Sequence, residues 1–382
     1  MSSMWGNKIR ISLFGESHGP AIGVVVDGLP SGVELDLEQI AAQMRRRAPG
    51  NFPWSTTRKE ADEAEVLSGF FNGKTCGTPL AAIIRNTNTR SVDYSDLVTK
   101  PRPGHADLAG MLKYDLKDAR DILERASARE TVARVSAGAV AKTLLAEFGI
   151  KITSHVVIIG GVHADPSGLG INQIITISEK SPVRCADPDA SRSMCKEIEA
   201  AGEAGDTLGG MFEVIIHGVP PGLGSHTQWD RRLDGNIAKA IMSIQAVKGV
   251  GFGMGFDVAQ ARGSAVHDEI FYDKNKGFYR NTNNSGGIEG GMSNGEDIII
   301  RAAMKPISTL KKPLSSVNVK TKKKVLATVE RSDVCAVPAA GVIGEAVSAI
   351  EIAGAMLEKF GCDSIREMKR NFNGYIEQVR KF

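Results

Sequence analysis

The stretch VVVDGLPSG at residues 24–32 has a near copy, VIIHGVPPG, at residues 214–222. Each copy is a run of mostly β-branched residues followed by a turn rich in glycine and proline, which predicts a buried strand ending in a tight turn. A chance match in so short a stretch is the alternative. We interpret the pair as an internal duplication with halves near residues 1–205 and 206–382.

A helix is predicted after each copy. Asp36 and Gln39 form a capping pair at the start of the first helix. Apolar residues then recur at helical spacing, and the same spacing follows the second copy. These residues are Leu37, Ile40, Ala41 and Met44 in the first helix, and Ile237, Ala240, Ile241 and Ile244 in the second. Because no linker rich in proline and serine separates the halves, we expect two α+β halves that share one core in a single domain, residues 1–382.

Other segments complete the predicted architecture. Residues 150–159 are typical of a strand, and residues 130–147, 339–360 and 364–381 are typical of helices. Ala133, Ala137 and Ala141 lie four residues apart, so a second helix can pack closely on that face. Strands and helices do not alternate regularly, which disfavours a Rossmann or barrel fold.

The composition is that of a soluble globular protein. Of the 382 residues, 42% are hydrophobic and 24% are charged, and the formal net charge is +3. A charge so close to balance argues against generic binding to nucleic acid or to a membrane surface. The basic residues are clustered, as at residues 45–47 and 320–324, which favours local sites for anions.

The cysteine pattern and the N-terminus indicate a compartment. The five cysteines are an odd number and include no CxxC pair, which disfavours a disulfide framework or a structural zinc site and favours a reducing environment. The N-terminus lacks the apolar segment of a signal peptide. We expect no stretch to approach the roughly 20 apolar residues of a membrane-spanning helix. We therefore expect a cytoplasmic protein without a membrane partner or a metal.

Common motifs for nucleotide binding and for zinc-dependent hydrolysis are missing from the sequence: GxxxxGK[ST], a strand-coupled GxGxxG and HExxH. The remaining candidates are polar clusters in glycine-rich segments. Glycine there either lets the backbone approach a ligand closely or simply forms a loop.

Two of these clusters contain a histidine. His18 lies in GESHG, residues 15–19, after a strand-like stretch, and could donate a proton near neutral pH; a loop histidine bonded to backbone is the alternative. Arg102 and His105 lie in RPGHAD, residues 102–107, where arginine offers a planar fork of donors to a carboxylate or phosphate. The similar triplet at His163 lacks the Arg-Pro-Gly approach and is interpreted as an ordinary loop.

Three further clusters suit anions. RASARET, residues 125–131, leads into a helix, so Ser127 and nearby backbone amides could bind an anion there; a capping sequence is the alternative. MKPIST, residues 304–309, places a cation and two hydroxyls around a proline turn. In RSDVC, residues 331–335, Arg331 could bind an anion while Asp333 acts as a base or a helix cap.

Taken together and in this order, the motifs resemble those of the chorismate synthase family. The resemblance spans nearly the whole chain and rests on GESHG 15–19, RPGHAD 102–107, SARET 127–131, SIQAVKG 243–249, GGIEGG 286–291, MKP 304–306, and RSDVC 331–335 with Val337-Pro338.

The resemblance implies a β–α–β sandwich with two pseudo-symmetric halves around a helical core, and a homotetramer. It also implies a lyase that needs reduced FMN and removes the C3 phosphate and a C6 proton from 5-enolpyruvylshikimate 3-phosphate by 1,4-anti elimination, giving chorismate. Reduced flavin would lend an electron that weakens the bond to phosphate, while the protein supplies position and charge. NADPH would act at most as an indirect reductant.

The resemblance also implies residue roles. His18 would protonate the departing phosphate, His105 would lie near flavin N1, and Asp333 would help to remove the C6 proton. Substrate or NADP would be bound by Ser17, Arg46, Arg102 and Arg129. FMN would be held by Arg125, Ala126, Ser127, Gln245, Ala246, Gly290, Lys305, Pro306, Ile307, Ser308, Thr309 and Arg331.

The sequence departs from the family pattern in three places. Ile122-Leu123-Glu124 stand where many members have three glycines, and Ala126 replaces a serine, so its expected contact is through backbone only. Ser332 stands where many members have histidine. Phe52-Pro53-Trp54 lie where a second arginine of the NADP contact is usual, which leaves Arg58 as a speculative substitute.

Two other functions compete with the lyase. A flavin reductase would use the same pocket for net hydride transfer and would consume NADPH stoichiometrically. A nucleic-acid-binding protein would use the basic clusters and show binding that depends steeply on salt.

Overall fold

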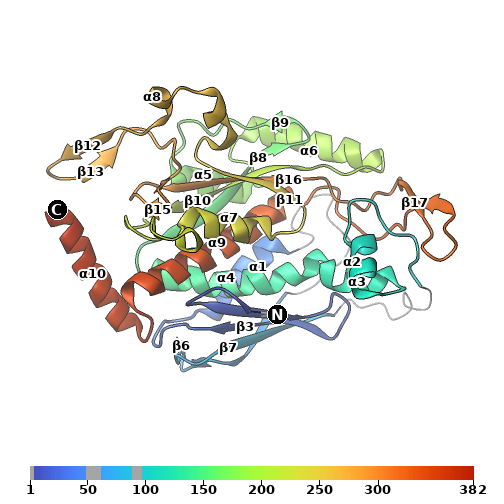
Figure 1. The fold of residues 1–382 in the computed structure, drawn as a ribbon, viewed down its shortest axis with the longest axis horizontal. Helices are drawn as coiled ribbons and strands as arrows, with labels where there is room; N and C mark the ends of the chain where they lie inside the picture. The colour runs from blue at the N-terminus through green and yellow to red at the C-terminus, as the bar shows by residue number, and fades with distance from the viewer. Residues whose placement is uncertain (1–3, 49–61, 88–96) are drawn as a thin grey trace.

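The computed structural model describes residues 4–48, 62–87 and 97–382. Two antiparallel sheets enclose a layer of helices, as Figure 1 shows. Arg58 lies outside the described residues. The predicted α+β class and the β–α–β sandwich are both confirmed.

The first sheet has five strands in the order β1-β2-β3-β7-β4. Its bounds are β1 Met4–Trp5, β2 Arg10–Gly15, β3 Ala21–Asp27, β4 Ala64–Ser68 and β7 Leu80–Arg85. The first copy of the repeated stretch forms the central strand, β3. Its Ile22, Val24 and Val26 are buried because alternate side chains of a strand face the same side, here the helical layer.

The second sheet has the order β11-β16-β10-β8-β9. Its bounds are β8 Lys151–Ile159, β9 Val162–His163, β10 Gly210–His217, β11 Val247–Phe252 and β16 Ile298–Met304. The second copy forms its central strand, β10. Phe212, Val214 and Ile216 on this strand are completely buried.

The two sheets repeat one topology. The order β2-β3-β7-β4 in the first sheet corresponds to β8-β10-β16-β11 in the second, and a helix follows each central strand. The predicted duplication therefore extends well beyond the repeated stretch. The division near residue 205 stays a prediction; in the second sheet, β8 from Lys151 onward pairs with β10, which follows that division.

Four helices form the middle layer: α1 Leu37–Arg47, α4 Thr131–Ala146, α7 Leu233–Met242 and α9 Val337–Phe360. Asp36 caps α1, its carboxylate accepting from the backbone N–H groups of Glu38 and Gln39. Ala133, Ala137 and Ala141 of α4 are buried, as their spacing predicts. A Cβ on Gly138 would lie 2.3 Å from that of Ala346, so α4 and α9 approach too closely there for any side chain. One buried cluster draws residues from both sheets and all four helices.

Helix α9 corrects one prediction. Contrary to the expectation from the sequence, it is long and apolar enough to cross a membrane by length and composition, with a mean hydropathy of 1.5 over its most apolar 18 residues. However, 83% of that stretch is buried inside the protein. Because α9 lies between two sheets and against α4, its apolar composition is that of a core helix (Figure 1).

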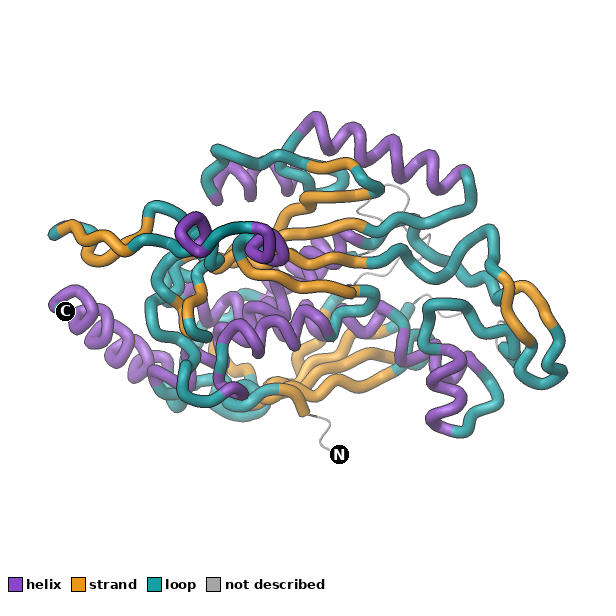
Figure 2. The backbone as a smooth tube through the Cα atoms, turned by 45° about the horizontal axis from the view of Figure 1, so that its top comes forward, coloured by secondary structure: helices purple, strands orange, loops and turns teal. Residues whose placement is uncertain are grey.

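The remaining elements surround this sandwich. Figure 2 shows the helices α5 and α6 along the second sheet, and the C-terminal helix α10 and a β-hairpin projecting at one end. Helices α2 and α3 lie at the opposite end of the layer, beside the β17–β18 hairpin (Figure 1). Their bounds are α2 Asp107–Tyr114, α3 Ala119–Ala126, α5 Ile171–Lys180, α6 Pro188–Glu203, α8 Gly263–Val266, α10 Ile365–Lys381, β5 Phe70–Phe71, β6 Lys74–Thr75, β12 Ile270–Asp273, β13 Gly277–Arg280, β14 Ile288–Glu289, β15 Met292–Ser293, β17 Ser315–Val317 and β18 Lys324–Leu326, with 3₁₀ turns at Ala128–Glu130, Trp229–Arg231 and Gly255–Gln260.

Candidate active site

The first histidine lies where α3 ends and α4 begins. The loop of residues 15–19, here called the His18 loop, follows β2 and packs against the last turn of α3. His18 Nδ1 lies 2.8 Å from Glu124 Oε1, and the backbone N–H of His18 donates to Glu124 Oε2 at 2.7 Å. The Ser127 hydroxyl donates to that of Ser17 at 3.1 Å. These contacts fix the imidazole and two hydroxyls at one place.

Arg129 is buried beside the same loop. Its Nε donates to Asn86 Oδ1 at 3.0 Å and its Nη1 pairs with Asp62, while Arg47 Nη1 donates to the other oxygen of Asp62 at 3.1 Å. Arg129 Nη2 is buried without a hydrogen-bond partner among the described residues. Because a buried donor without an acceptor is costly, this nitrogen suits an anionic ligand.

Asp333 lies near this arginine pair. Burial lowers the pKa of Arg47, and the negative charges of Asp62 and Asp333 oppose that effect. The following residue, Val334, accepts a hydrogen bond from Leu208 N at 2.9 Å, and the neighbouring Thr207 hydroxyl donates to Ile307 O at 2.7 Å. These bonds join the segment that carries Asp333 to residues 305–309, while Asp333 itself lies near the arginines beside His18.

The second histidine is also held by a carboxylate. His105 Nδ1 lies 2.5 Å from Asp107 Oδ1, and Arg102 Nε donates to Asp107 Oδ2 at 2.9 Å. Although burial alone would raise it, hydrogen bonds from His105 and Arg102 hold the pKa of Asp107 well below its usual range. Arg102 Nη2 lies 3.0 Å from the same Nδ1, so the imidazole is held between a carboxylate and a guanidinium. Arg102 also reaches the Thr309 hydroxyl at 2.9 Å.

Residues 304–309 join this histidine to the second sheet. The Lys305 ammonium donates to Gly104 O at 3.0 Å and to the Ser308 hydroxyl at 2.8 Å. Its backbone N–H donates to Ala246 O at 2.9 Å. Burial, followed by repulsion from Lys248, lowers the pKa of Lys305. The turn at Ala246 has φ of +68°, and the side chain of Gln245 donates to Glu130 Oε1 at 2.6 Å.

Arg125 and Arg331 differ in how their guanidinium groups are used. Arg125 donates to the backbone oxygens of Gly15 at 2.9 Å and Leu13 at 3.1 Å, so it ties α3 to the His18 loop. It also lines an apolar cavity of about 500 Å³ between β2, α7 and α9. Arg331 is exposed, two residues before Asp333.

Gly290 is not brought to this site within one chain. It lies in the turn between β14 and β15, whose Gly291 O accepts from the backbone N–H of Leu233, the first residue of α7. Ala246 lies beyond the other end of that helix. A ten-residue helix is about 15 Å long, which separates Gly290 from the remaining cofactor candidates.

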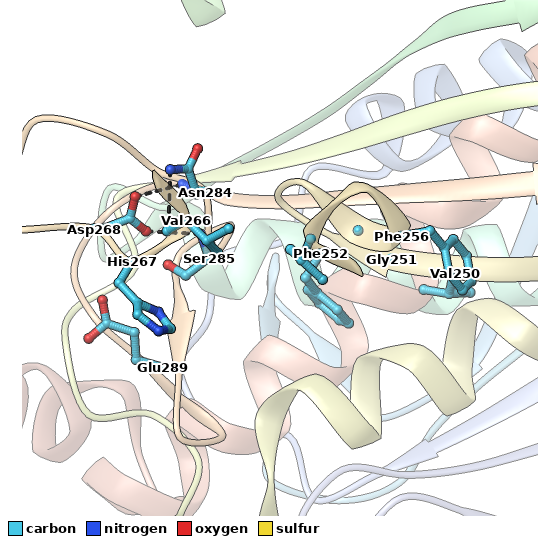
Figure 3. A pocket seen from close by; sticks show the side chains of 12 residues that line it. Val250, Gly251, Phe252, Phe256, Val266, His267, Asp268, Asn284, Ser285 and Glu289 are labelled. Carbon is cyan, nitrogen blue, oxygen red and sulfur yellow. Dashed lines mark hydrogen bonds between the residues drawn. The ribbon is translucent and has the colours of Figure 1, made fainter. Parts of the chain in front are cut away.

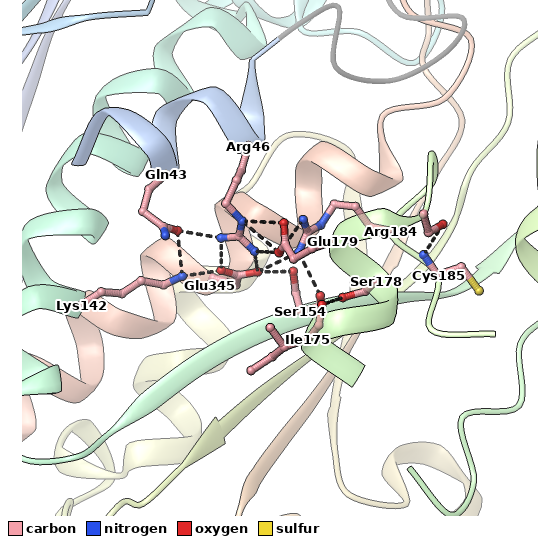
Figure 4. Close-up of polar contacts among 11 residues, drawn as sticks. Gln43, Arg46, Lys142, Ser154, Ile175, Ser178, Glu179, Arg184, Cys185 and Glu345 are labelled. Carbon is pink, nitrogen blue, oxygen red and sulfur yellow. Dashed lines mark hydrogen bonds and ion pairs between the residues drawn. The ribbon is translucent and has the colours of Figure 1, made fainter. Parts of the chain in front are cut away.

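Arg46 is also absent from this site. Its guanidinium binds two carboxylates: Nη1 donates to Glu345 Oε2 at 2.7 Å, and Nη2 donates to Glu179 Oε1 at 2.6 Å. Figure 4 shows this central cluster, which also contains Lys142 and Arg184. The predicted anion-binding role of Arg46 has no support here, because protein carboxylates already occupy its donors.

A cavity of about 430 Å³ lies apart from both histidines. It is lined by Val250, Phe252 and Phe256 around β11 and by Asp268 and Glu289, as Figure 3 shows. Glu289 adjoins Gly290, so this cavity belongs to the end of the molecule that lacks the catalytic candidates. In the part of the chain that the structure describes, no three His, Cys, Asp or Glu residues are grouped to hold a metal ion.

The residues at the site fit the binding of an anionic flavin and substrate. Arg129 Nη2 and Gln245 Oε1 are both buried without partners among the described residues, and they offer a donor and an acceptor. Lys305, Ser308 and Thr309 add a cation and hydroxyls on one turn, which suits a phosphate. Sequence reasoning missed Asp62, Asn86 and Glu124 as members of this site. Only Glu124 carried a signal, as a departure from the glycines usual there.

The chain is similar to known proteins over nearly its whole length. The chorismate synthase family profile matches residues 9–357. The chain is 50% identical to chorismate synthase of Geobacter sulfurreducens, covering 98% of this chain and 100% of that protein, and 51% identical to chorismate synthase of Symbiobacterium thermophilum, with the same coverage. It also resembles a solved crystal structure of chorismate synthase, with a TM-score of 0.81 and 41% identity, covering 99% of this chain and 100% of that one. The chain therefore belongs to the chorismate synthase family, the carbon–oxygen lyases that form chorismate in the last step of the shikimate pathway.

Proposed function

We propose that this chain forms chorismate by removing the C3 phosphate and a C6 proton from 5-enolpyruvylshikimate 3-phosphate at the site that contains His18, His105 and Asp333. The observation that carries this proposal is the pair of imidazoles. Each is held at Nδ1 by a carboxylate, and a buried arginine with an unpaired nitrogen lies beside one of them.

The substrate would be bound by its negative charges. Arg129 and Arg331, with the Ser17 hydroxyl, would bind its phosphate and carboxylates. Arg102, predicted to join them, already donates to Asp107 and Thr309 and would orient His105 instead. A hydrogen bond to a charged group contributes roughly 1.5–3 kcal/mol, so several such contacts could hold a highly anionic ligand. Arg46 is left out of this set because Glu179 and Glu345 bind it.

FMN would be held by residues 125–127, 245–246, 305–309 and Arg331. Lys305, Ser308 and Thr309 suit its phosphate, and Gln245 Oε1 offers an unpaired acceptor for a ring N–H. When bound, reduced FMN would lend electron density that weakens the C3–oxygen bond and would recover it as the new double bond forms, so that the cofactor is not consumed.

The protein's own groups would move the protons. His18 Nε2 donates a proton to the phosphate oxygen as the C3–oxygen bond breaks. Asp333 accepts the C6 proton, the electron pair of that C–H bond enters the new double bond, and chorismate and phosphate leave. His105, held at Nδ1 by Asp107, would present Nε2 to the cofactor and affect the cofactor's protonation.

We further propose a homotetramer in the cytoplasm, with NADPH only an indirect source of electrons for the flavin. Gly290 stays a candidate cofactor contact but stands apart from the others within one chain.

An anaerobic assay with dithionite-reduced FMN tests the function. Chorismate should accumulate over many turnovers, measured by its absorbance, with one phosphate released for each chorismate. A repeat with NADPH and oxidised FMN separates the lyase from a reductase. If substrate disappears only in proportion to NADPH consumed, the reductase interpretation holds instead.

A further inference from the structure

Glu124 binds the catalytic histidine at two points. One carboxylate oxygen lies 2.8 Å from His18 Nδ1, and the other accepts the His18 backbone N–H at 2.7 Å. We infer that Glu124 is a positioning residue for His18, setting its tautomer and orientation for proton donation. This inference rests on the proposed function of His18.

The last turn of α3 holds the whole His18 loop. Besides the two contacts to His18, the backbone oxygen of Glu124 accepts from Ser17 N at 3.0 Å. Arg125 adds its two hydrogen bonds to Gly15 and Leu13. Asp118 caps the start of α3, and Ser127 caps the 3₁₀ turn that follows its end, so Glu124 extends from a helix that is fixed at both ends.

The chemistry explains why a carboxylate is useful at this atom. An ionised carboxylate can only accept, so the imidazole nitrogen that faces it carries a proton. The charged imidazole can then donate from Nε2 to the departing phosphate and become neutral, still hydrogen-bonded to Glu124 through Nδ1–H. Asp107 makes the same contact to His105, so each catalytic histidine has its own orienting carboxylate.

A purely structural role is the competing explanation, since Glu124 also anchors the loop backbone. A double-mutant cycle separates the two, because a residue that acts only through His18 has no further effect once His18 is removed. The variants are Glu124→Ala, Glu124→Gln, His18→Ala and the double variant His18→Ala/Glu124→Ala. Asp121→Ala, an exposed carboxylate on the same helix, is the matched control.

Steady-state rates with reduced FMN would be measured for each variant, together with thermal unfolding. We expect Glu124→Ala to lower kcat by about 10- to 100-fold, less than the 10²–10⁴-fold that a general acid contributes. KM should change little. Glu124→Gln, which keeps an acceptor for the backbone, should recover part of the loss. In the His18→Ala background, Glu124→Ala should change kcat by less than about twofold.

The outcomes are distinct. If wild type makes no chorismate, the proposed function fails, and this inference fails with it. If wild type is active and Glu124→Ala matches it, or lowers kcat equally with and without His18, only the inference is overturned. A loss matched by Asp121→Ala would also overturn it, because the effect would then belong to the helix and not to the contact with His18.

Discussion

Arg46 and Arg129 both lie in buried clusters with carboxylates, yet the two clusters leave their arginines in different states. In the central cluster, Glu179 and Glu345 accept from all three nitrogens of Arg46. At the candidate active site, the single carboxylate of Asp62 is shared between Arg47 and Arg129, and Arg129 Nη2 keeps no partner among the described residues.

The difference lies in how many acceptors the protein supplies. Glu345 is completely buried and also accepts from Lys142 and from the Ser154 hydroxyl, so α1, α4, α9 and β8 meet at one carboxylate. Such a cluster joins the two halves of the fold. Asp62 serves two arginines, and Arg129 Nη2 is left for an added anion, whereas every guanidinium nitrogen of Arg46 donates to a carboxylate. The same residue types therefore stabilise the core in one place and prepare a binding site in the other.

The largest expected effect is the loss of a catalytic histidine. His105→Ala should lower kcat by about 10²–10⁴-fold, the contribution of a positioned acid or base. The matched control is His163→Ala, which changes the same histidine in a second His-Ala-Asp triplet that lies away from the site, and its kcat should be unchanged. Equal kcat values for the two variants, measured anaerobically with reduced FMN, would remove His105 from the mechanism.

The next effect concerns stability at the central cluster. Glu345→Gln leaves Arg46, Lys142 and Arg184 without their buried carboxylate, which should lower the free energy of unfolding by about 3–5 kcal/mol. Glu358→Gln is a control on the same helix, because its pair with Arg231 is exposed and its loss should leave unfolding nearly unchanged. Denaturant unfolding measures both.

The kcat of folded Glu345→Gln should remain near that of wild type. A loss of activity without a loss of stability would place Glu345 in catalysis and contradict its assignment to the core.

Replacing one arginine by alanine at the candidate active site, and one in the central cluster, sharpens the comparison further. Arg331→Ala should raise the KM for substrate by about 10- to 100-fold, since a charge-assisted contact contributes roughly 1.5–3 kcal/mol, and leave unfolding unchanged because Arg331 is exposed. Arg46→Ala should do the reverse, lowering stability with little change in KM. If both variants changed KM alike, Arg46 would belong to the binding site after all.

Much of the fold could be predicted because its signals are local. The apolar spacing after Asp36 and after Arg232 gave α1 and α7, and the repeated stretch gave the two central strands. The pairing across the predicted division at residue 205 could not be foreseen, because residues 151–159 indicate a strand but not its partner. That partner, β10, lies more than fifty residues later in the chain.

The site could be predicted only in part, because long-range contacts decide it as they decide the pairing of β8. The motifs identify residue types, but hydrogen-bond partners come from distant positions: Glu345 lies 299 residues from Arg46, and Glu124 lies 106 residues from His18. Nothing near Arg46 in sequence indicates that its donors are occupied, so it was placed with the anion-binding arginines. Three-dimensional pairing, and not composition, decides which arginines remain available.

The smallest effect is a dependence of stability on pH at the central cluster. Burial, more than the opposing attraction of Glu345, lowers the pKa of Lys142 from 10.5 to about 8. Between these two values the unfolded chain binds more protons at this lysine than the folded chain does. Its contribution to the free energy of unfolding should therefore rise as pH increases from about 8 to about 10.5.

Lys142→Met removes the titrating group at similar volume. The difference in unfolding free energy between wild type and Lys142→Met should increase with pH across that window, measured by urea unfolding at several pH values. Lys117→Met, at an exposed lysine, controls for the loss of one positive charge. If the difference stays flat or falls with pH, Lys142 keeps its proton in the folded cluster. The attraction of Glu345 would then outweigh the effect of burial on the pKa of Lys142, and the ion pairs of the central cluster would hold their charges even more firmly than the comparison with Asp62 implies.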